Sequence, residues 1–150
     1  MGTKTDSAMI VDASALVALA NQTDSTHQKA LAAVSSFEDT RLVVIPAELF
    51  AETINIMGKK ISREVALNQA RELLSSPVFT IMETTPEIKT KALTIWSKQT
   101  SDVSYTDCLV MACADALATK QIFGFDRAFK ANGYTRVGLD DSPDQELEAA

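Results

Sequence analysis

The chain has 150 residues, 46% of them hydrophobic, which is enough for one globular domain with a sizeable core. Its formal net charge of −6 argues against a protein that holds nucleic acid by bulk electrostatic attraction, but not against an enzyme whose bound cations neutralise its acids. No run approaches the roughly 18 apolar residues of a membrane span, and the polar start lacks the apolar segment of a signal peptide, so we expect a cytoplasmic protein without a membrane partner.

Composition changes at both ends of the chain. Residues 1–8 are mostly polar, and residues 141–150 are acidic without a single basic residue. Neither stretch has enough apolar residues to form a core of its own. We therefore expect a flexible segment over 1–8, one domain over 9–140, and a disordered acidic tail over 141–150.

The first half of the chain alternates between apolar runs typical of strands and apolar residues at helical spacing. Pro46 suits the first turn of a helix, and Gly58 is a natural stop for that helix. We expect, in order, a strand over 8–11, helices over 14–20 and 25–37, a strand over 41–45, and a helix from Pro46 to about Met57.

The second half continues this alternation. Ser62 and Thr85 stand where a side chain can cap a helix, and Pro86 follows at the first helical position. We expect helices over 62–74, 85–98 and 105–119, strands over 78–82 and 121–125, a short helix over 127–130 and a possible last strand over 135–139. Because helices separate the strands, the pattern predicts an α/β fold with a mainly parallel sheet covered on both faces.

Two aspartates directly follow predicted strands: Asp12 after the first strand and Asp126 after the fourth. Parallel strands end at one edge of a sheet, which is where open α/β folds bind their ligands. Glu52 lies in the helix after the second strand, and Asp107 is near the start of the helix over 105–119. If these four carboxylates converge, their charges need a cation. Oxygen ligands without a His or Cys cluster favour Mg²⁺ or Mn²⁺ over Zn²⁺.

Each acid also has a purely structural interpretation. Ser104 and Asp107 fit a capping box, in which the carboxylate only satisfies an amide at the helix start. Glu52 could be a solvated residue on a helix face, and Asp126 could begin a turn and cap the short helix after it. Asp12 is the strongest candidate for a site, because a carboxylate at the end of a buried strand is costly unless something binds it.

Four stretches of the sequence carry a family resemblance: "IVDASALVAL", "VIPAELFAETINIM", "VSYTDCLVMACADALA" and "GFDRAF". In this order they resemble the PIN domain family, and most closely its single-domain VapC-type toxins. The family's acid after the first strand, with a hydroxyl two residues on, matches Asp12 and Ser14. Its helix glutamate matches Glu52, its S-x-x-D matches Asp107, and its acid before x-x-F matches Asp126.

The resemblance implies a PIN-like three-layer α/β/α sandwich, with a mainly parallel central sheet of about five strands flanked by helices. It also implies a metal-dependent endoribonuclease that hydrolyses RNA phosphodiester bonds with Mg²⁺ or Mn²⁺. The implied metal ligands and catalytic residues are Asp12, Glu52, Asp107 and Asp126. Ser14 and Thr106 would support these carboxylates through hydrogen bonds. Family analogy further implies a homodimer and a VapB-type antitoxin protein as partner.

An acidic site that accepts RNA needs some basic surface beside it. Lys59, Lys60 and Arg63 follow the helix over 46–57, and Arg127 lies in the fourth stretch, so all four are candidates for contacts to backbone phosphates. Lysines at the end of a helix also complement its dipole, which would explain Lys59 and Lys60 without RNA.

Several alternatives stay open at this point. The family often has a further acid or Asn near the fourth carboxylate, but this chain offers only the distant Asp115, so one or two metal ions are possible. A solitary PIN nuclease of RNA processing or decay would have the same site and no antitoxin. A PIN interaction module would have lost catalysis. An aspartyl-phosphate enzyme is disfavoured, because it needs a second acid where Ser14 stands.

Overall fold

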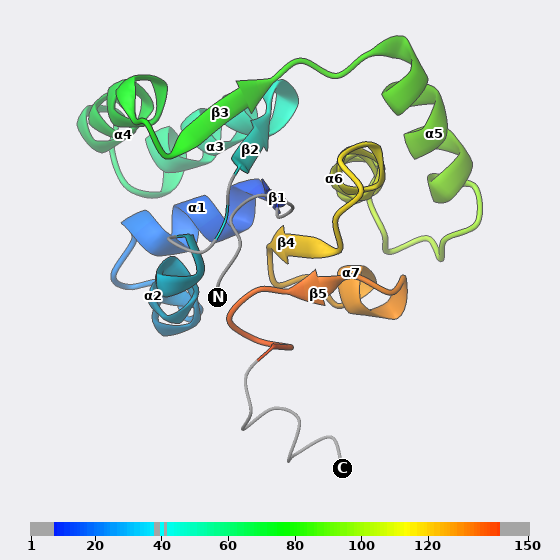
Figure 1. The fold of residues 1–150 in the computed structure, drawn as a ribbon. Coiled ribbons are helices and arrows are strands. Elements are labelled where there is room, and N and C mark those ends of the chain that lie inside the picture. Colours follow the sequence, from blue (N-terminus) through cyan, green and yellow to red (C-terminus); the bar gives the residue numbers. More distant parts are fainter. Residues whose placement is uncertain (1–7, 38–39, 41, 142–150) are drawn as a thin grey trace.

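The computed structural model describes residues 8–37, 40 and 42–141. Within these residues, five strands form one central sheet (Figure 1). They are β1 (Ala8–Val11), β2 (Leu42–Pro46), β3 (Phe79–Met82), β4 (Gln121–Phe123) and β5 (Thr135–Arg136). Their order across the sheet is β3-β2-β1-β4-β5, so β1 is central. Every neighbouring pair is parallel, which confirms the predicted sheet.

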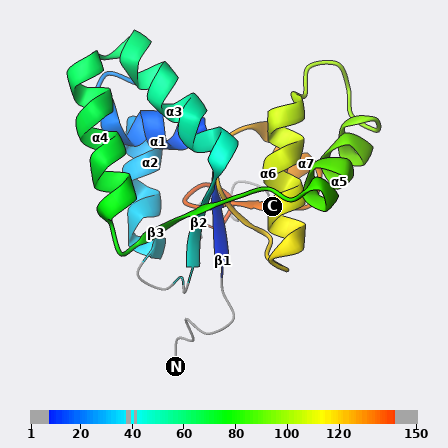
Figure 2. The same cartoon turned by 90° about the horizontal axis from the view of Figure 1, so that it is seen from above.

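The strands are connected mainly by helices. These are α1 (Ala13–Ala20), α2 (His27–Val34), α3 (Ala47–Lys60), α4 (Arg63–Ser75), α5 (Pro86–Trp96), α6 (Tyr105–Ala116) and α7 (Arg127–Ala131), with a 3-10 turn, η1, at Ser35–Phe37. Figure 2 shows α1 to α4 on one side of the strands and α5 to α7 on the other, which confirms the three-layer α/β/α sandwich. None of the helices in the described ranges combines the length and the apolar character needed to cross a membrane.

Three helices begin at the capping residues that the sequence indicates. The Ser62 hydroxyl accepts a hydrogen bond from the Val65 amide at 3.0 Å, and α4 starts there. The Thr85 hydroxyl accepts from the Ile88 amide at 3.2 Å at the start of α5, and Ser104 caps α6. Each cap satisfies an amide that the first helical turn leaves without a partner, so these side chains determine where the helices begin.

Two predicted helix ends are wrong. Instead of stopping at Gly58, α3 continues through it to Lys60. Glycine inside a helix costs about 1 kcal/mol but removes no backbone hydrogen bond, so it does not by itself end a helix. α6 ends at Ala116 rather than Thr119, because Ala118 has a φ of 53° and leaves the helical conformation.

Other predicted ranges also shorten: the helix expected over 85–98 is Pro86–Trp96, and the strand expected over 78–82 starts at Phe79. The helix expected over 25–37 starts at His27 and gives way to η1, and β4 stops at Phe123 rather than at residue 125. β5 covers two residues instead of 135–139. Gly138, with a φ of +83°, reverses the chain after β5, which is a conformation that glycine adopts without strain. The terminal expectations for 1–7 and 142–150 lie outside the described residues.

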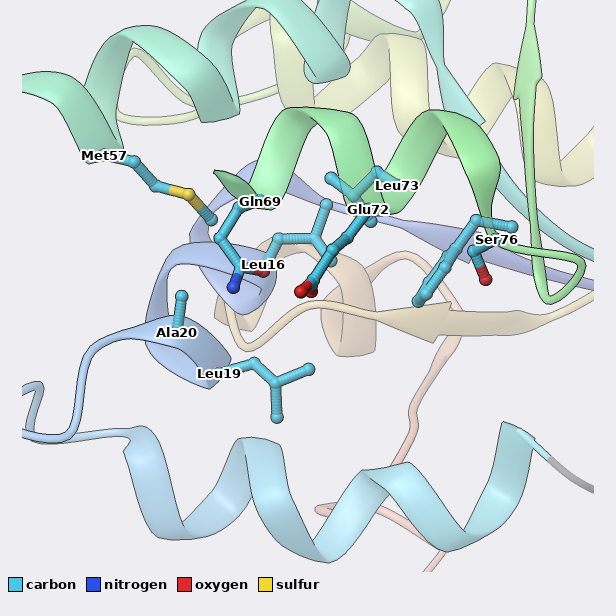
Figure 3. Close-up of a pocket in the computed structure, with 9 residues that line it drawn as sticks. Leu16, Leu19, Ala20, Met57, Gln69, Glu72, Leu73 and Ser76 are labelled. Carbon is cyan, nitrogen blue, oxygen red and sulfur yellow. The ribbon is translucent and has the colours of Figure 1, made fainter. Parts of the chain in front are cut away.

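A hollow of about 350 Å³ lies between α1, α3, α4 and β3 (Figure 3). Its polar lining comes from Gln69 and Glu72 of α4 and from Ser76, the residue directly after that helix. Its apolar lining is formed by Leu16, Leu19, Ala20, Met57, Leu73 and Phe79. The four acids predicted to form the site are not among these residues, so this hollow and the candidate site are separate features.

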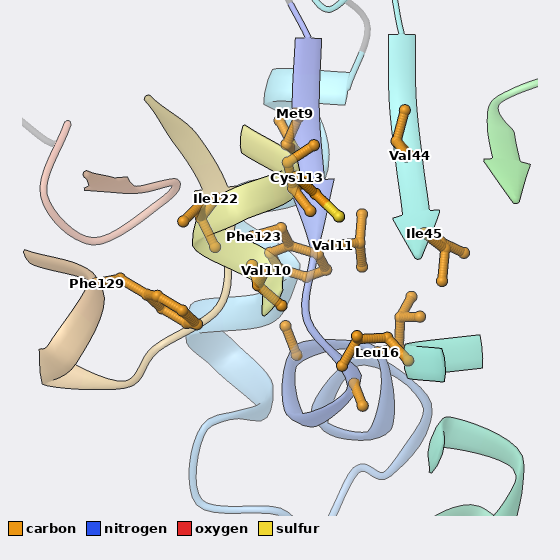
Figure 4. Packing of buried hydrophobic residues seen from close by; sticks show 14 of the residues in the cluster. Met9, Val11, Leu16, Val44, Ile45, Val110, Cys113, Ile122, Phe123 and Phe129 are labelled. Carbon is orange, nitrogen blue, oxygen red and sulfur yellow. The ribbon is translucent and has the colours of Figure 1, made fainter. Parts of the chain in front are cut away.

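The hydrophobic core packs around the central strands (Figure 4). It includes Met9, Val11, Leu16, Val44, Ile45, Val110, Ile122, Phe123 and Phe129. Every residue from Cys108 to Ala114 is buried, because α6 packs against both α5 and β1. Cys108 and Cys113 are both free thiols. This packing holds the start of α6 in a fixed position beside the end of β1.

Candidate functional site

The structure places all four predicted acids around one open hollow of about 350 Å³ at the carboxyl edge of the sheet. β1 leads into Asp12, α3 carries Glu52, α6 carries Asp107, and Asp126 lies between β4 and α7. The complete lining is Asp12, Ala13, Ser14, Glu52, Ile56, Asp102, Ser104, Thr106, Asp107 and Asp126. The two predicted supporting hydroxyls, of Ser14 and Thr106, are therefore also in the hollow.

Asp12 is the least exposed acid of the hollow, with 7% of its surface accessible. Its Oδ2 accepts a hydrogen bond from the Ser14 hydroxyl at 2.7 Å. Burial, together with repulsion from Asp107 and Glu52, raises the pKa of Asp12 to about 7 from its ordinary 3.8, although the Ser14 hydrogen bond opposes this rise. A carboxylate in such surroundings ionises readily only when a positive charge is beside it.

Gly124 allows the chain after β4 to come very close to Asp12. A Cβ at this position would lie 2.9 Å from the Asp12 Cβ and 2.8 Å from Cε2 of Phe129, which are distances that real side chains do not tolerate. The Asp12 amide also donates to the Phe123 carbonyl at 2.9 Å. The loop that carries Asp126 is therefore packed directly against the end of β1.

Asp107 and Asp126 act as helix caps and also face the hollow. The Asp107 amide donates to the Ser104 hydroxyl at 3.0 Å, and Asp107 Oδ2 accepts from the Ser104 amide at 3.4 Å, which completes the capping box. Asp126 Oδ1 accepts from the Ala128 amide at 2.9 Å. Burial and the nearby Asp126 raise the pKa of Asp107. The structural and the functional interpretations of these residues are thus compatible, because each cap uses a single carboxylate oxygen.

Glu52 lines the acidic hollow, but its neighbours Glu48 and Asn55 on α3 do not. Glu48 lies one turn before Glu52, and its Oε2 accepts a hydrogen bond from the Thr84 hydroxyl at 2.6 Å outside the acidic hollow. Asn55, three residues after Glu52, lines a different hollow between α3 and α4. Only Glu52 of these three faces the other acids.

The donor set of the hollow fits a hard divalent cation. All four acids and both hydroxyls offer oxygen, which suits Mg²⁺ or Mn²⁺ and not Zn²⁺. In the described part of the chain, no three acidic, His or Cys side chains already stand close enough to hold one ion together. Uncompensated carboxylates repel each other, so a cation would have to draw them inward around Asp12.

The basic candidates lie outside the acidic hollow. Lys59 and Arg63 line the neighbouring hollow between α3 and α4. Lys60 lies near Asp24, whose pKa is lowered by hydrogen bonds from Thr26 and by the charge of Lys60. Arg127 is the first residue of α7. None of the four residues lines the acidic hollow, so their contact with phosphates stays a prediction.

Sequence reasoning missed Asp102, which lines the hollow from the loop before α6. Its position five residues before Asp107, in a polar loop, is the only sequence signal for it. Asp115, the other acid considered near Asp126, is engaged elsewhere: it accepts from the Tyr134 hydroxyl at 2.7 Å and lies 3.2 Å from Lys91 Nζ. Asp115 therefore contributes nothing to the acidic hollow.

Comparison with known proteins identifies the family to which this chain belongs. The crystal structure of VapC20 from Mycobacterium tuberculosis, a toxin that cleaves the sarcin–ricin loop, has a similar fold, with a TM-score of 0.77 and 21% sequence identity over 86% of this chain and 98% of that chain. No match was found among curated protein sequences. The sequence model of the PIN domain matches residues 9–133, which is most of the chain. The protein is therefore a member of the PIN domain family.

Proposed function

We propose that the protein is a metal-dependent endoribonuclease that hydrolyses RNA phosphodiester bonds with Mg²⁺ or Mn²⁺ at the acidic hollow. The observation that carries this proposal is Asp12: a buried carboxylate at a strand end, with Glu52, Asp107 and Asp126 around the same hollow. Four carboxylates gathered at one place repel one another, and a bound cation would offset this repulsion.

Each residue has a definite task in this proposal. Asp12 would be the main residue holding the cation, and Asp107 and Asp126 would help to hold it. Glu52 would also hold the cation or would orient the attacking water. Ser14 fixes the Asp12 carboxylate through the 2.7 Å hydrogen bond. A divalent cation bound here supplies positive charge for the phosphoryl oxygens and lowers the pKa of a bound water.

We further propose that the protein is the toxin of a type II toxin–antitoxin pair. The fold shared with VapC20 and membership of the PIN domain family support this proposal. It implies an RNA substrate, a VapB-type antitoxin, a homodimer and a cytoplasmic location, where RNA is available. Lys59, Lys60, Arg63 and Arg127 are the proposed phosphate contacts beside the acids. A solitary PIN nuclease would share the chemistry but have no antitoxin gene beside its own.

Cleavage of a mixed pool of structured and single-stranded RNAs tests the activity. The purified protein should cut RNA with Mn²⁺ or Mg²⁺, and cutting should stop with EDTA and in the Asp12→Asn variant. Asp115→Asn is the matched control, because Asp115 is an acid of the same fold outside the hollow. Calorimetry should show Mn²⁺ binding that is lost in Asp12→Asn only. If wild-type protein neither binds Mn²⁺ nor cuts RNA, the nuclease proposal is wrong and an interaction module remains.

A further inference from the structure

Arg136, at the end of β5, holds together two segments of the chain. Its Nε donates to Asp140 Oδ2 and its Nη2 to Asp140 Oδ1, both at 2.8 Å. Its Nη1 donates to the backbone carbonyl of Phe125 at 3.1 Å. The guanidinium therefore ties the turn at Asp140 to the loop between β4 and α7, which carries Asp126.

This ion pair is largely withdrawn from solvent. The side chains of Arg136 and Asp140 are only 12% and 11% exposed. Burial alone would raise the pKa of Asp140, but the hydrogen bonds and charge of Arg136 hold it below its usual range. Three of the five N–H donors of the guanidinium are used inside the protein. Arg136 is thus poorly placed to contact the phosphates of an RNA.

The carbonyl that Arg136 holds belongs to the residue immediately before Asp126. Residues 124–126 have no regular secondary structure, so side-chain contacts decide how this loop lies. The Phe125 ring packs edge-on against Phe123, with ring centroids 5.9 Å apart, and Gly124 packs against Asp12. Neither of these contacts involves the backbone carbonyl of Phe125. The Arg136 hydrogen bond fixes the direction of the peptide that leads into Asp126.

We propose that Arg136, held in place by Asp140, is a positioning residue that directs the Asp126 carboxylate into the acidic hollow. The importance of this for catalysis rests on the nuclease function proposed above, whereas the positioning itself does not. Both residues lie beyond residues 9–133, which the family model matches, so family membership assigns them no role. The C-terminal turn at 136–140 is therefore part of the site although it contributes no group to the hollow.

The conservative variant Arg136→Lys tests the positioning. Lysine keeps the charge but has a single ammonium, which cannot bind both Asp140 oxygens and the Phe125 carbonyl in the planar geometry of a guanidinium. The probe is hydrogen exchange of the Ala128 amide, which bonds to Asp126 Oδ1 at 2.9 Å in the wild type. In metal-free Arg136→Lys, exchange at Ala128 should be at least about tenfold faster, as expected when a supporting contact is lost.

Two controls separate positioning from loss of overall stability. The buried amide of Val110 in α6 reports global unfolding, and its exchange should change much less than that of Ala128. Asp115→Asn also removes an ion pair and should leave Ala128 exchange unaltered. If Arg136→Lys does not fold, Asp140→Asn weakens the same contact and takes its place. Unaltered Ala128 exchange in the folded variant would overturn the proposal.

The kinetics of RNA cleavage then test whether the positioning of Asp126 matters for the acidic hollow. The Mn²⁺ concentration for half-maximal cleavage should rise about tenfold in Arg136→Lys and kcat should fall, while KM for RNA stays the same. A raised KM with unaltered Ala128 exchange would make Arg136 an RNA contact and refute the proposal. If Ala128 exchange accelerates as expected but the wild type neither binds Mn²⁺ nor cuts RNA, the positioning is supported and the nuclease proposal alone fails.

Discussion

Replacing Asp12 with asparagine should stabilise the metal-free protein while it abolishes metal binding. The pKa of Asp12 is raised to about 7 from 3.8, chiefly by burial. At about 1.4 kcal/mol per pKa unit, a shift of roughly 3 units corresponds to at most ~4 kcal/mol, which is the destabilisation that ionised Asp12 causes in the fold. Asparagine has nearly the same shape and no charge, so it removes this destabilisation.

The stability that Asp12→Asn gains over the wild type should depend on pH. Between pH 3.8 and about 7, folded protein keeps a proton on Asp12 that the unfolded chain has lost. The free energy of unfolding of the wild type therefore falls as the pH rises through this window. Above it the full destabilisation is present, and below it Asp12 is protonated in both states. The excess stability of Asp12→Asn should be largest at pH 8 and should nearly vanish at pH 4.

Urea and thermal unfolding in EDTA measure this difference. At pH 8 the variant should melt up to roughly 16 °C above the wild type, at about 2–4 °C per kcal/mol for a chain of this size. Saturating Mn²⁺, at about 100 times its Kd, should stabilise the wild type by ~2.7 kcal/mol and leave Asp12→Asn unchanged. Asp115→Asn, which removes a paired carboxylate, should instead lower stability. A variant less stable than wild type at pH 8, or a gain equal at pH 4 and pH 8, would refute this reasoning.

Three further predictions concern other residues of the site. Glu52→Gln should lose at least about tenfold in RNA cleavage, whereas Glu48→Gln, one turn earlier on α3, should cleave normally in the same assay. Gly124→Ala should cost ~1–3 kcal/mol in urea unfolding and weaken Mn²⁺ binding, because its Cβ would meet the Asp12 Cβ at 2.9 Å; wild-type stability would contradict the close approach. Ser104→Ala should cost about 1 kcal/mol through loss of the α6 cap, and an unchanged urea midpoint would show that the cap is dispensable.

Much of the site follows from local sequence patterns. A strand ends where its apolar run meets a charged residue, so Asp12 could be placed at the sheet edge from sequence alone. The capping box at Ser104 and Asp107 is also a local pattern, and the structure contains it. Other features were beyond such reasoning. Gly58 looked like a helix stop, but the packing of α3 against α1 and α4 carries the helix through it.

The amino-acid sequence by itself determined the parallel α/β architecture and which acids could come together. Strand periodicity and helix caps are local patterns, and the order of the elements can be read along the chain. Only the tertiary structure decided that Asp102 joins the hollow, and that Glu48 binds the Thr84 hydroxyl outside it. It also decided that Arg136 reaches the Phe125 carbonyl eleven residues earlier. Such contacts depend on helix rotation and loop path, which arise from packing between distant segments and leave no local signal in the sequence.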